Sequence, residues 1–142
     1  MASTADTTVS SDVPAGPAVE LRAGNHGSED RVVLEFFGVD GIEVLNHSLD
    51  EKPPVRGGSG EPIPGMTGTV FLHVVVVGVP ATMIAPTSPT AYDLPIVKSA
   101  VVNDIEGGTL EAGVGLAASV DYEVKVEGNK IIVNMAQGPL GR

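Results

Sequence analysis

The sequence predicts an all-β protein, folded as a single-domain β-sandwich of about six to eight short strands. Stretches in which apolar and polar residues alternate are separated by turns rich in glycine and proline. No long stretch shows the apolar period of an amphipathic helix. The 142 residues have a mean hydropathy of +0.21, so the chain has enough apolar side chains to bury one core.

The first half of the chain predicts three strands. Residues 17–22 form a short candidate strand, and residues 31–37 alternate clearly, with Val32, Leu34 and Phe36 on one face. Residues 38–41, GVDG, are a turn signal that leads into a candidate strand over residues 42–49. We therefore expect residues 31–37 and 42–49 to pair as a hairpin.

A long loop and a central strand follow. Residues 50–68 contain four prolines and five glycines, too many for a helix or a strand. Loops of this length in compact domains tend to be functional or mobile. Residues 69–77, TVFLHVVVV, are apolar on both faces and predict a central strand covered on both sides. This run is too short to cross a bilayer and His73 interrupts it, so no membrane span is expected.

The last third of the chain predicts three further strands. Residues 80–99 contain several prolines and leave room for one short helix. Strands are expected over residues 110–119, 121–127 and 130–136, and Gly128 and Asn129 form a two-residue turn that makes the last two a tight hairpin.

The two ends of the chain differ from the predicted domain, which spans residues 17–136. Residues 1–16 contain six serines or threonines and predict a disordered tail or linker, and residues 137–142 predict a flexible tail. Residues 1–16 also lack the basic start and apolar segment of a secretory signal, so no signal segment is expected within them.

The charge and the composition exclude several classes of function. The formal net charge of −10 would repel nucleic acids and anionic lipid surfaces, so neither is an expected partner. The acidic residues are spread singly, Asp30 among them, and are expected on the solvated surface. Because the chain has no cysteine, it cannot form a disulfide, a thiolate nucleophile or a cysteine metal site.

Two short motifs suggest chemistry that their surroundings do not support. Residues 113–118, GVGLAA, match a loose dinucleotide fingerprint, but the residues after them alternate as a strand where the fingerprint requires a helix. We expect Gly113 and Gly115 to permit close packing or a bulge instead. Residues 57–61 nearly spell a nucleophile elbow, but Glu61 stands where the last glycine is required. The sequence therefore predicts no catalytic residue and no cofactor.

The histidines and aromatic residues give no strong site. His26, His47 and His73 lack the paired spacing of metal ligands, so no metal site is predicted, although the sequence leaves open whether His47 and His73 meet in space. With three phenylalanines, two tyrosines and no tryptophan, most aromatic rings are needed for the core. A glycan or peptide ligand would therefore be held by hydrogen bonds and by cations such as Arg31 and Arg56.

Several segments together resemble a known family. They are residues 30–36 (DRVVLEF), 41–44 (GIEV), 58–64 (GSGEPIP), 69–74 (TVFLHV), 101–107 (VVNDIEG), 113–116 (GVGL), 122–124 (YEV) and 131–134 (IIVN). In this order they resemble the AMIN-like domain of actinobacterial exported proteins and lipoproteins, and more distantly the AMIN domain of amidases and secretins. The resemblance runs from about residue 19 to residue 136.

The resemblance implies a β-sandwich outside the cytoplasmic membrane, secreted or lipid-anchored at the cell envelope. It implies a non-enzymatic domain that binds peptidoglycan or an envelope protein. Such modules carry an arginine in the strand context of Arg31, and the candidate binding residues are Arg31, Arg56, Ser59 and Glu61. The structural alternative for Arg31 is a surface cross-strand pair with a carboxylate.

Two other functions compete with this one. The first is a protein-interaction or assembly domain without affinity for the wall, acting through an exposed strand edge or through loop 50–68. The second, an enzyme, is the weakest of the three, because no catalytic constellation stands out.

Overall fold

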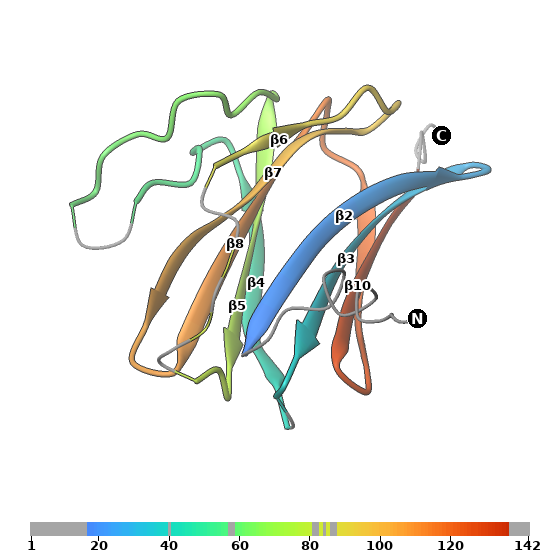
Figure 1. Cartoon of the computed structure of the whole chain (residues 1–142). Coiled ribbons are helices and arrows are strands. Elements are labelled where there is room, and N and C mark those ends of the chain that lie inside the picture. The colour runs from blue at the N-terminus through green and yellow to red at the C-terminus, as the bar shows by residue number, and fades with distance from the viewer. Residues whose placement is uncertain are drawn as a thin grey trace, which may run out of the picture.

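The computed structural model describes residues 17–39, 41–56, 59–80, 83, 85 and 88–136. Nine strands form two antiparallel sheets that pack face to face (Figure 1). The four-stranded sheet has the order β2-β3-β10-β9 and the five-stranded sheet has the order β4-β5-β8-β7-β6. The bounds are β2 Ala18–His26, β3 Glu29–Phe37, β4 Glu43–Asp50, β5 Val70–Val77, β6 Thr90–Ala91, β7 Val97–Glu106, β8 Thr109–Leu116, β9 Asp121–Glu127 and β10 Lys130–Ala136.

The all-β class and the sandwich architecture are confirmed. The described residues form nine strands rather than six to eight, because the two-residue β6 adds to eight longer strands. β7 is not predicted from the sequence, because its apolar residues do not alternate with polar ones. The predicted tails, residues 1–16 and 137–142, lie outside the described residues.

The core lies between the two sheets and follows the alternation seen in the sequence. Val32, Leu34 and Phe36 point inwards from β3, and none is more than 2 % exposed. Leu72, Val74 and Val76 of β5 meet them from the other sheet, with exposures of at most 1 %. These six buried side chains form the centre of the hydrophobic core. Burying each of them stabilises the fold by about 1.5–3 kcal/mol.

The predicted hairpin of residues 31–37 with 42–49 is wrong, although both strands exist. β3 pairs with β2 and β10, and β4 pairs with β5 in the other sheet. Both edges of β3 are therefore occupied, and the connection from β3 to β4 crosses from one sheet to the other. Gly38 and Gly41, with φ of 73° and 76°, provide the left-handed backbone conformations for this crossing.

The later elements agree with the sequence in part. The hairpin around Gly128 and Asn129 is confirmed, since Glu127 is directly opposite Lys130. The short helix for which residues 80–99 leave room is absent from the described part of that range, which holds β6 and the start of β7 instead. Residues 81, 82, 84, 86 and 87 of that range lie outside the described residues.

Asp30 is buried rather than on the solvated surface, where the sequence analysis had placed it. It lies on β3 with an exposure of 0 %. Its Oδ2 accepts hydrogen bonds from the backbone N–H groups of Ile96 at 2.7 Å and Val97 at 2.9 Å, and its Oδ1 accepts one from Asn25 Nδ2 at 2.8 Å. A strand of the four-stranded sheet is thereby joined to the start of β7 in the five-stranded sheet.

We expect Asp30→Ala to lower the free energy of unfolding by about 2–5 kcal/mol, because it leaves two buried backbone N–H groups without an acceptor. Asp30→Asn keeps one acceptor oxygen and should cost less. Urea unfolding at neutral pH measures both changes. Glu106→Ala, at an exposed position of β7, is the control and should change stability by less than about 0.5 kcal/mol. Equal stability of Asp30→Ala and Glu106→Ala would contradict the role of this carboxylate.

Candidate functional site

Arg31 lies on the outer face of the four-stranded sheet, opposite to the face that covers the core. Its Nε donates to Asn134 Oδ1 at 2.8 Å, and Asn134 is its direct partner on β10. The cross-strand pair expected for Arg31 is therefore present, but the partner is an amide and not a carboxylate. None of the ion pairs between described residues involves Arg31, so its guanidinium has no direct carboxylate partner among them.

A shallow pocket of about 150 Å³ lies beside Arg31. Gly24, directly opposite Arg31 on β2, leaves the pocket open, since a Cβ there would meet only His26 Nε2 at 4.0 Å. Arg22 also lines the pocket, but it is ion-paired with Glu35 at 2.9 Å. A guanidinium that has no ion-pair partner and lies beside an unfilled pocket can bind an anion such as a carboxylate.

Loop 50–68 lies on the other side of the sandwich, across the outer face of the five-stranded sheet (Figure 1). A Cβ at Gly113 would lie 2.5 Å from Pro54 Cγ, and a Cβ at Gly115 would collide with the carbonyl oxygen of Thr67. The prediction that these two glycines permit close packing is confirmed. Phe71 on the outer face of β5 is 5 % exposed, so the strand is covered on both sides at this end, whereas Val75 and Val77 on the same face are half-buried.

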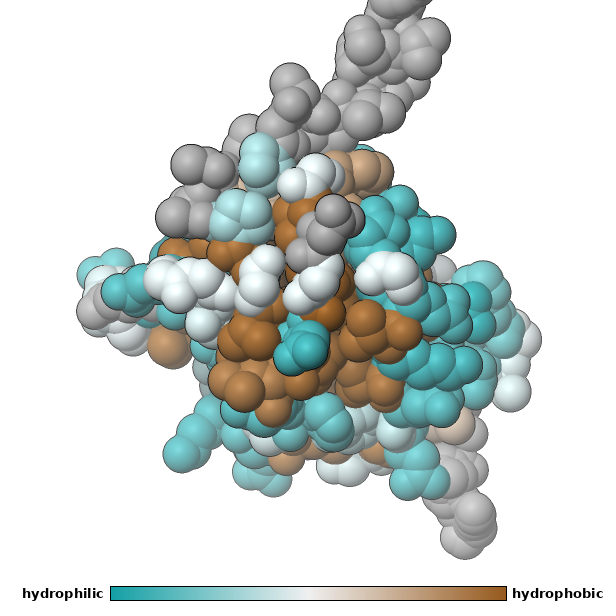
Figure 2. All heavy atoms as spheres, turned by 90° about the horizontal axis from the view of Figure 1, so that it is seen from below, coloured by the Kyte–Doolittle hydropathy of each residue, from teal (hydrophilic) through white to brown (hydrophobic). Residues whose placement is uncertain are grey.

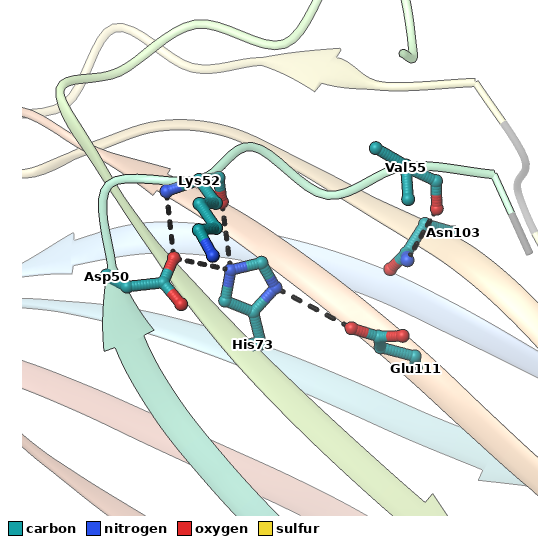
Figure 3. Close-up of polar contacts among 6 residues, drawn as sticks. All are labelled: Asp50, Lys52, Val55, His73, Asn103 and Glu111. Carbon is teal, nitrogen blue, oxygen red and sulfur yellow. Dashed lines mark hydrogen bonds and ion pairs between the residues drawn. The ribbon is translucent and has the colours of Figure 1, made fainter. Parts of the chain in front are cut away.

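His73 fastens the start of this loop to the sheet (Figure 3). Its Nε2 lies 3.1 Å from Asp50 Oδ1 and 3.0 Å from the carbonyl oxygen of Lys52, and its Nδ1 lies 3.6 Å from Glu111 Oε2. Because both partners of Nε2 are acceptors, Nε2 carries the proton and donates. Asp50 Oδ1 also accepts the backbone N–H of Lys52 at 2.8 Å, and this bond is the main cause that lowers the pKa of Asp50, with His73 adding to it.

Two further side chains fasten the loop from β7. Asn103 Nδ2 donates to the carbonyl oxygen of Val55 at 2.9 Å (Figure 3). Ser99 Oγ donates to the carbonyl oxygen of Thr67 at 2.7 Å and accepts the N–H of the same residue at 3.0 Å. Both legs of the loop are therefore bonded to the sheet. Sequence reasoning missed these contacts, because serine and asparagine inside a strand give no signal of their partners.

The other candidate binding residues meet at the tip of the loop. The N–H of Arg56 donates to the carbonyl oxygen of Glu61 at 2.9 Å, and the N–H of Glu61 donates to Ser59 Oγ at 3.3 Å. The structure thus brings Arg56, Ser59 and Glu61 together in one turn. Arg31 lies on the opposite outer face of the sandwich, so the four candidates do not form a single site.

The two strand histidines do not meet. His47 is paired with Val74 and His73 is paired with Ser48, so the two imidazoles point to opposite faces of the sheet. His47 Nδ1 lies 2.8 Å from the hydroxyl of Tyr122 on β9, and the two rings are edge to face at 5.3 Å. Among the described residues, no group of three or more metal-ligating side chains could hold a metal ion.

One end of the sandwich carries a second hollow. The connection from β3 to β4 and the turn from β9 to β10 line a pocket of about 750 Å³ there, with Asn129 bonded to the carbonyl oxygen of Phe36. Figure 2 shows apolar side chains gathered at the centre of this end, with polar side chains around them. The pocket itself is lined by Phe36, Gly38, Val39, Gly41, Gly128 and Asn129.

Comparison with known proteins gives one match. A protein-family model described as AMIN-like domain matches residues 16–137. No curated protein and no solved structure matches the chain significantly. In the part of the chain that the structure describes, no helix is long and apolar enough to span a membrane.

We expect Gly115→Ala to destabilise the fold by about 1–3 kcal/mol, because its Cβ cannot fit beneath Thr67 unless the loop moves. Urea unfolding measures the loss, and trypsin should cleave after Arg56 faster if the loop is displaced. Gly24→Ala is the matched control, since its Cβ meets open space on a strand. If the two variants were equally stable, the loop could not be packed against Gly115.

We expect the carboxyl group of Asp50 to titrate below pH 3.8, because the backbone N–H of Lys52 stabilises its charged form. A lowered pKa in the folded state means that the contribution to stability is present above pH 3.8 and is lost as the pH falls through the folded pKa. Carboxyl-carbon NMR measures the midpoint. In His73→Gln the midpoint should rise but stay below 3.8, since the Lys52 bond is the larger cause. A wild-type midpoint at or above 3.8 would contradict this geometry.

Proposed function

The chain belongs to the AMIN-like domain family, and we propose that it is a non-enzymatic domain that binds peptidoglycan or an envelope protein outside the cytoplasmic membrane. AMIN-like domains are typically extracytoplasmic and generally bind rather than catalyse. On this proposal the domain works as a secreted or lipid-anchored protein of the cell envelope.

The proposal rests on the position of Arg31 on an open sheet face and on its lack of an ion-pair partner among the described residues. The outer face of its sheet is exposed or half-buried along β9 and along β2 from Glu20 onwards, whereas loop 50–68 covers the other sheet's outer face around Gly113 and Gly115. On this open face, which also carries carboxylates such as Glu35 and Glu123, Arg31 forms no ion pair with a described carboxylate. A guanidinium in this state favours a ligand that offers a carboxylate, as the peptide stems of peptidoglycan do.

The aromatic residues support binding by charge and hydrogen bonds rather than by stacking. Phe36 and Phe71 are buried, with exposures of 0 % and 5 %. Tyr122 is bonded to His47 across the sandwich. These three rings are therefore occupied by the fold, as the small number of aromatic residues in the sequence suggested.

A second candidate function, a protein-interaction domain without affinity for the wall, is favoured by a different observation. The edge strands β4 and β9 lie on the same side of the sandwich and expose Leu45 and Val126. Loop 50–68 is less suited to this role, since both of its legs are bonded to the sheet.

We expect the wild-type domain to co-sediment with purified sacculi at low salt, and Arg31→Ala to weaken this binding about tenfold or more, because a charged hydrogen bond contributes about 1.5–3 kcal/mol. Arg31→Lys should be intermediate, since an ammonium lacks the planar donor geometry of a guanidinium. Lys52→Ala removes the same charge from the other side of the sandwich and should bind like the wild type.

Three outcomes separate the candidate sites. A wild-type domain that stays in the supernatant would exclude peptidoglycan as the ligand. Arg31→Ala that binds as tightly as Lys52→Ala would exclude the open face as the site. Arg56→Ala that loses binding while Arg31→Ala keeps it would assign the site to the loop tip.

A further inference from the structure

The side of the sandwich between β4 and β9 is open. On the opposite side, Asp30 joins the two sheets and β2 lies over β7. Among the strands that the structure describes, β4 and β9 are each the last of their sheet, so each has one edge without a described neighbouring strand. Hydrogen-bonded and non-bonded pairs alternate along an antiparallel ladder, so every second residue of β9 turns its N–H and C=O away from β10. These groups are available to an added strand.

An apolar groove of about 410 Å³ lies between the two edge strands. Leu45 is 61 % exposed and Val126 is 44 % exposed, and Val55 is the third large apolar side chain that the described part of the chain exposes. Two of these three therefore meet at one groove. Its lining is completed by Val44, Asn46, His47 and Val124.

The two edges differ in their readiness to accept a strand. The register of β4 shifts between Val44 and Asn46, so Leu45 is the extra residue of a bulge, which hinders regular pairing at that edge. β9 pairs with β10 without any shift, so its free edge is straight. Its inward side chains, Val124 and Val126, carry no charge that would block an incoming strand.

Tyr122 and His47 close one end of the groove and thereby set its length. The hydrogen bond of 2.8 Å between them spans the two sheets. Burial raises the pKa of Tyr122, so its hydroxyl keeps its proton and can donate to His47. From Tyr122 to Val126 a strand rises about 3.4 Å per residue, which leaves room for an added segment of about five residues.

The charges beside the groove select the occupant. The outward side chains of β9 are Asp121, Glu123, Lys125 and Glu127, which are mostly acidic. An added strand with apolar residues at alternate positions would place these in the groove and its remaining side chains beside the acids, where cations are favoured. A second copy of the chain would bring three carboxylates and a single cation, Lys125, against the same set, so net repulsion opposes self-pairing of β9.

We propose that the groove between β4 and β9 binds an extended basic segment of a partner protein, which adds to the free edge of β9 and inserts alternate apolar side chains over Val126 and Leu45. This proposal does not depend on the binding of peptidoglycan by the open face around Arg31.

A fluorescein-labelled peptide of alternating lysine and valine, as long as the seven residues of β9, is the probe. We expect the domain to bind it with a Kd of about 10–100 μM, measured by fluorescence anisotropy. Val126→Asp should weaken binding about tenfold or more, whereas Val55→Asp, an equally exposed valine that does not line the groove, should stay within about twofold. A peptide with proline at the central valine should bind poorly, because proline cannot donate to the ladder.

Equal binding by Val126→Asp and Val55→Asp, or equal binding of the proline peptide, would overturn the proposal. If a glutamate–valine peptide bound more tightly than the lysine–valine peptide, the proposal that the partner segment is basic would be wrong. Light scattering that shows a dimer in the wild type and a monomer in Val126→Asp would make a second copy the occupant and would also overturn it. Arg31→Ala should bind the peptide normally and Val126→Asp should bind sacculi normally, so that failure of either function is recognised separately.

Discussion

The buried carboxylate of Asp30 is the interaction on which the arrangement of the two sheets depends. It lies on β3, but two of its three hydrogen bonds are to backbone groups at the start of β7 in the other sheet. A carboxylate without exposure to water is stable only when donors surround it, so the positions of β3 and β7 are coupled. With that side joined, the opposite side between β4 and β9 is held by the weaker contact of His47 with Tyr122.

The sequence predicted the features that arise from local pattern. The alternation of β3, the turn at Gly128 and the close packing at Gly113 and Gly115 all depend on neighbouring residues or on the absence of a side chain. The pairing of β3 with β4 was predicted wrongly, because a turn signal indicates that the chain turns and not which sheet it enters. The burial of Asp30 could not be predicted either, since its two backbone donors lie more than sixty residues away along the chain.

As with the fold, the local parts of the candidate site were predictable from the sequence, and the contacts between distant strands were not. Arg31 was found through resemblance and lies on the outer face of its sheet. Gly24, which leaves the pocket open, belongs to the adjacent strand β2, but the amide that orients Arg31 comes from β10, which is distant in sequence. Arg56, Ser59 and Glu61 were predicted together and do lie together, because they belong to one local turn. Their separation from Arg31 follows from the sandwich, in which the loop covers one outer face and leaves the other open.

The proposed function depends on this difference between the two outer faces, because we propose the open face around Arg31 as the binding surface. The most direct measurement is NMR of the nitrogen-15-labelled domain during titration with soluble peptidoglycan fragments. The account predicts that the largest shifts occur at the Nε–H of Arg31, the amide of Gly24 and the side-chain amide of Asn134. Shifts confined to the amides of Ser59 and Glu61 at the loop tip, or no shifts at all, would contradict it.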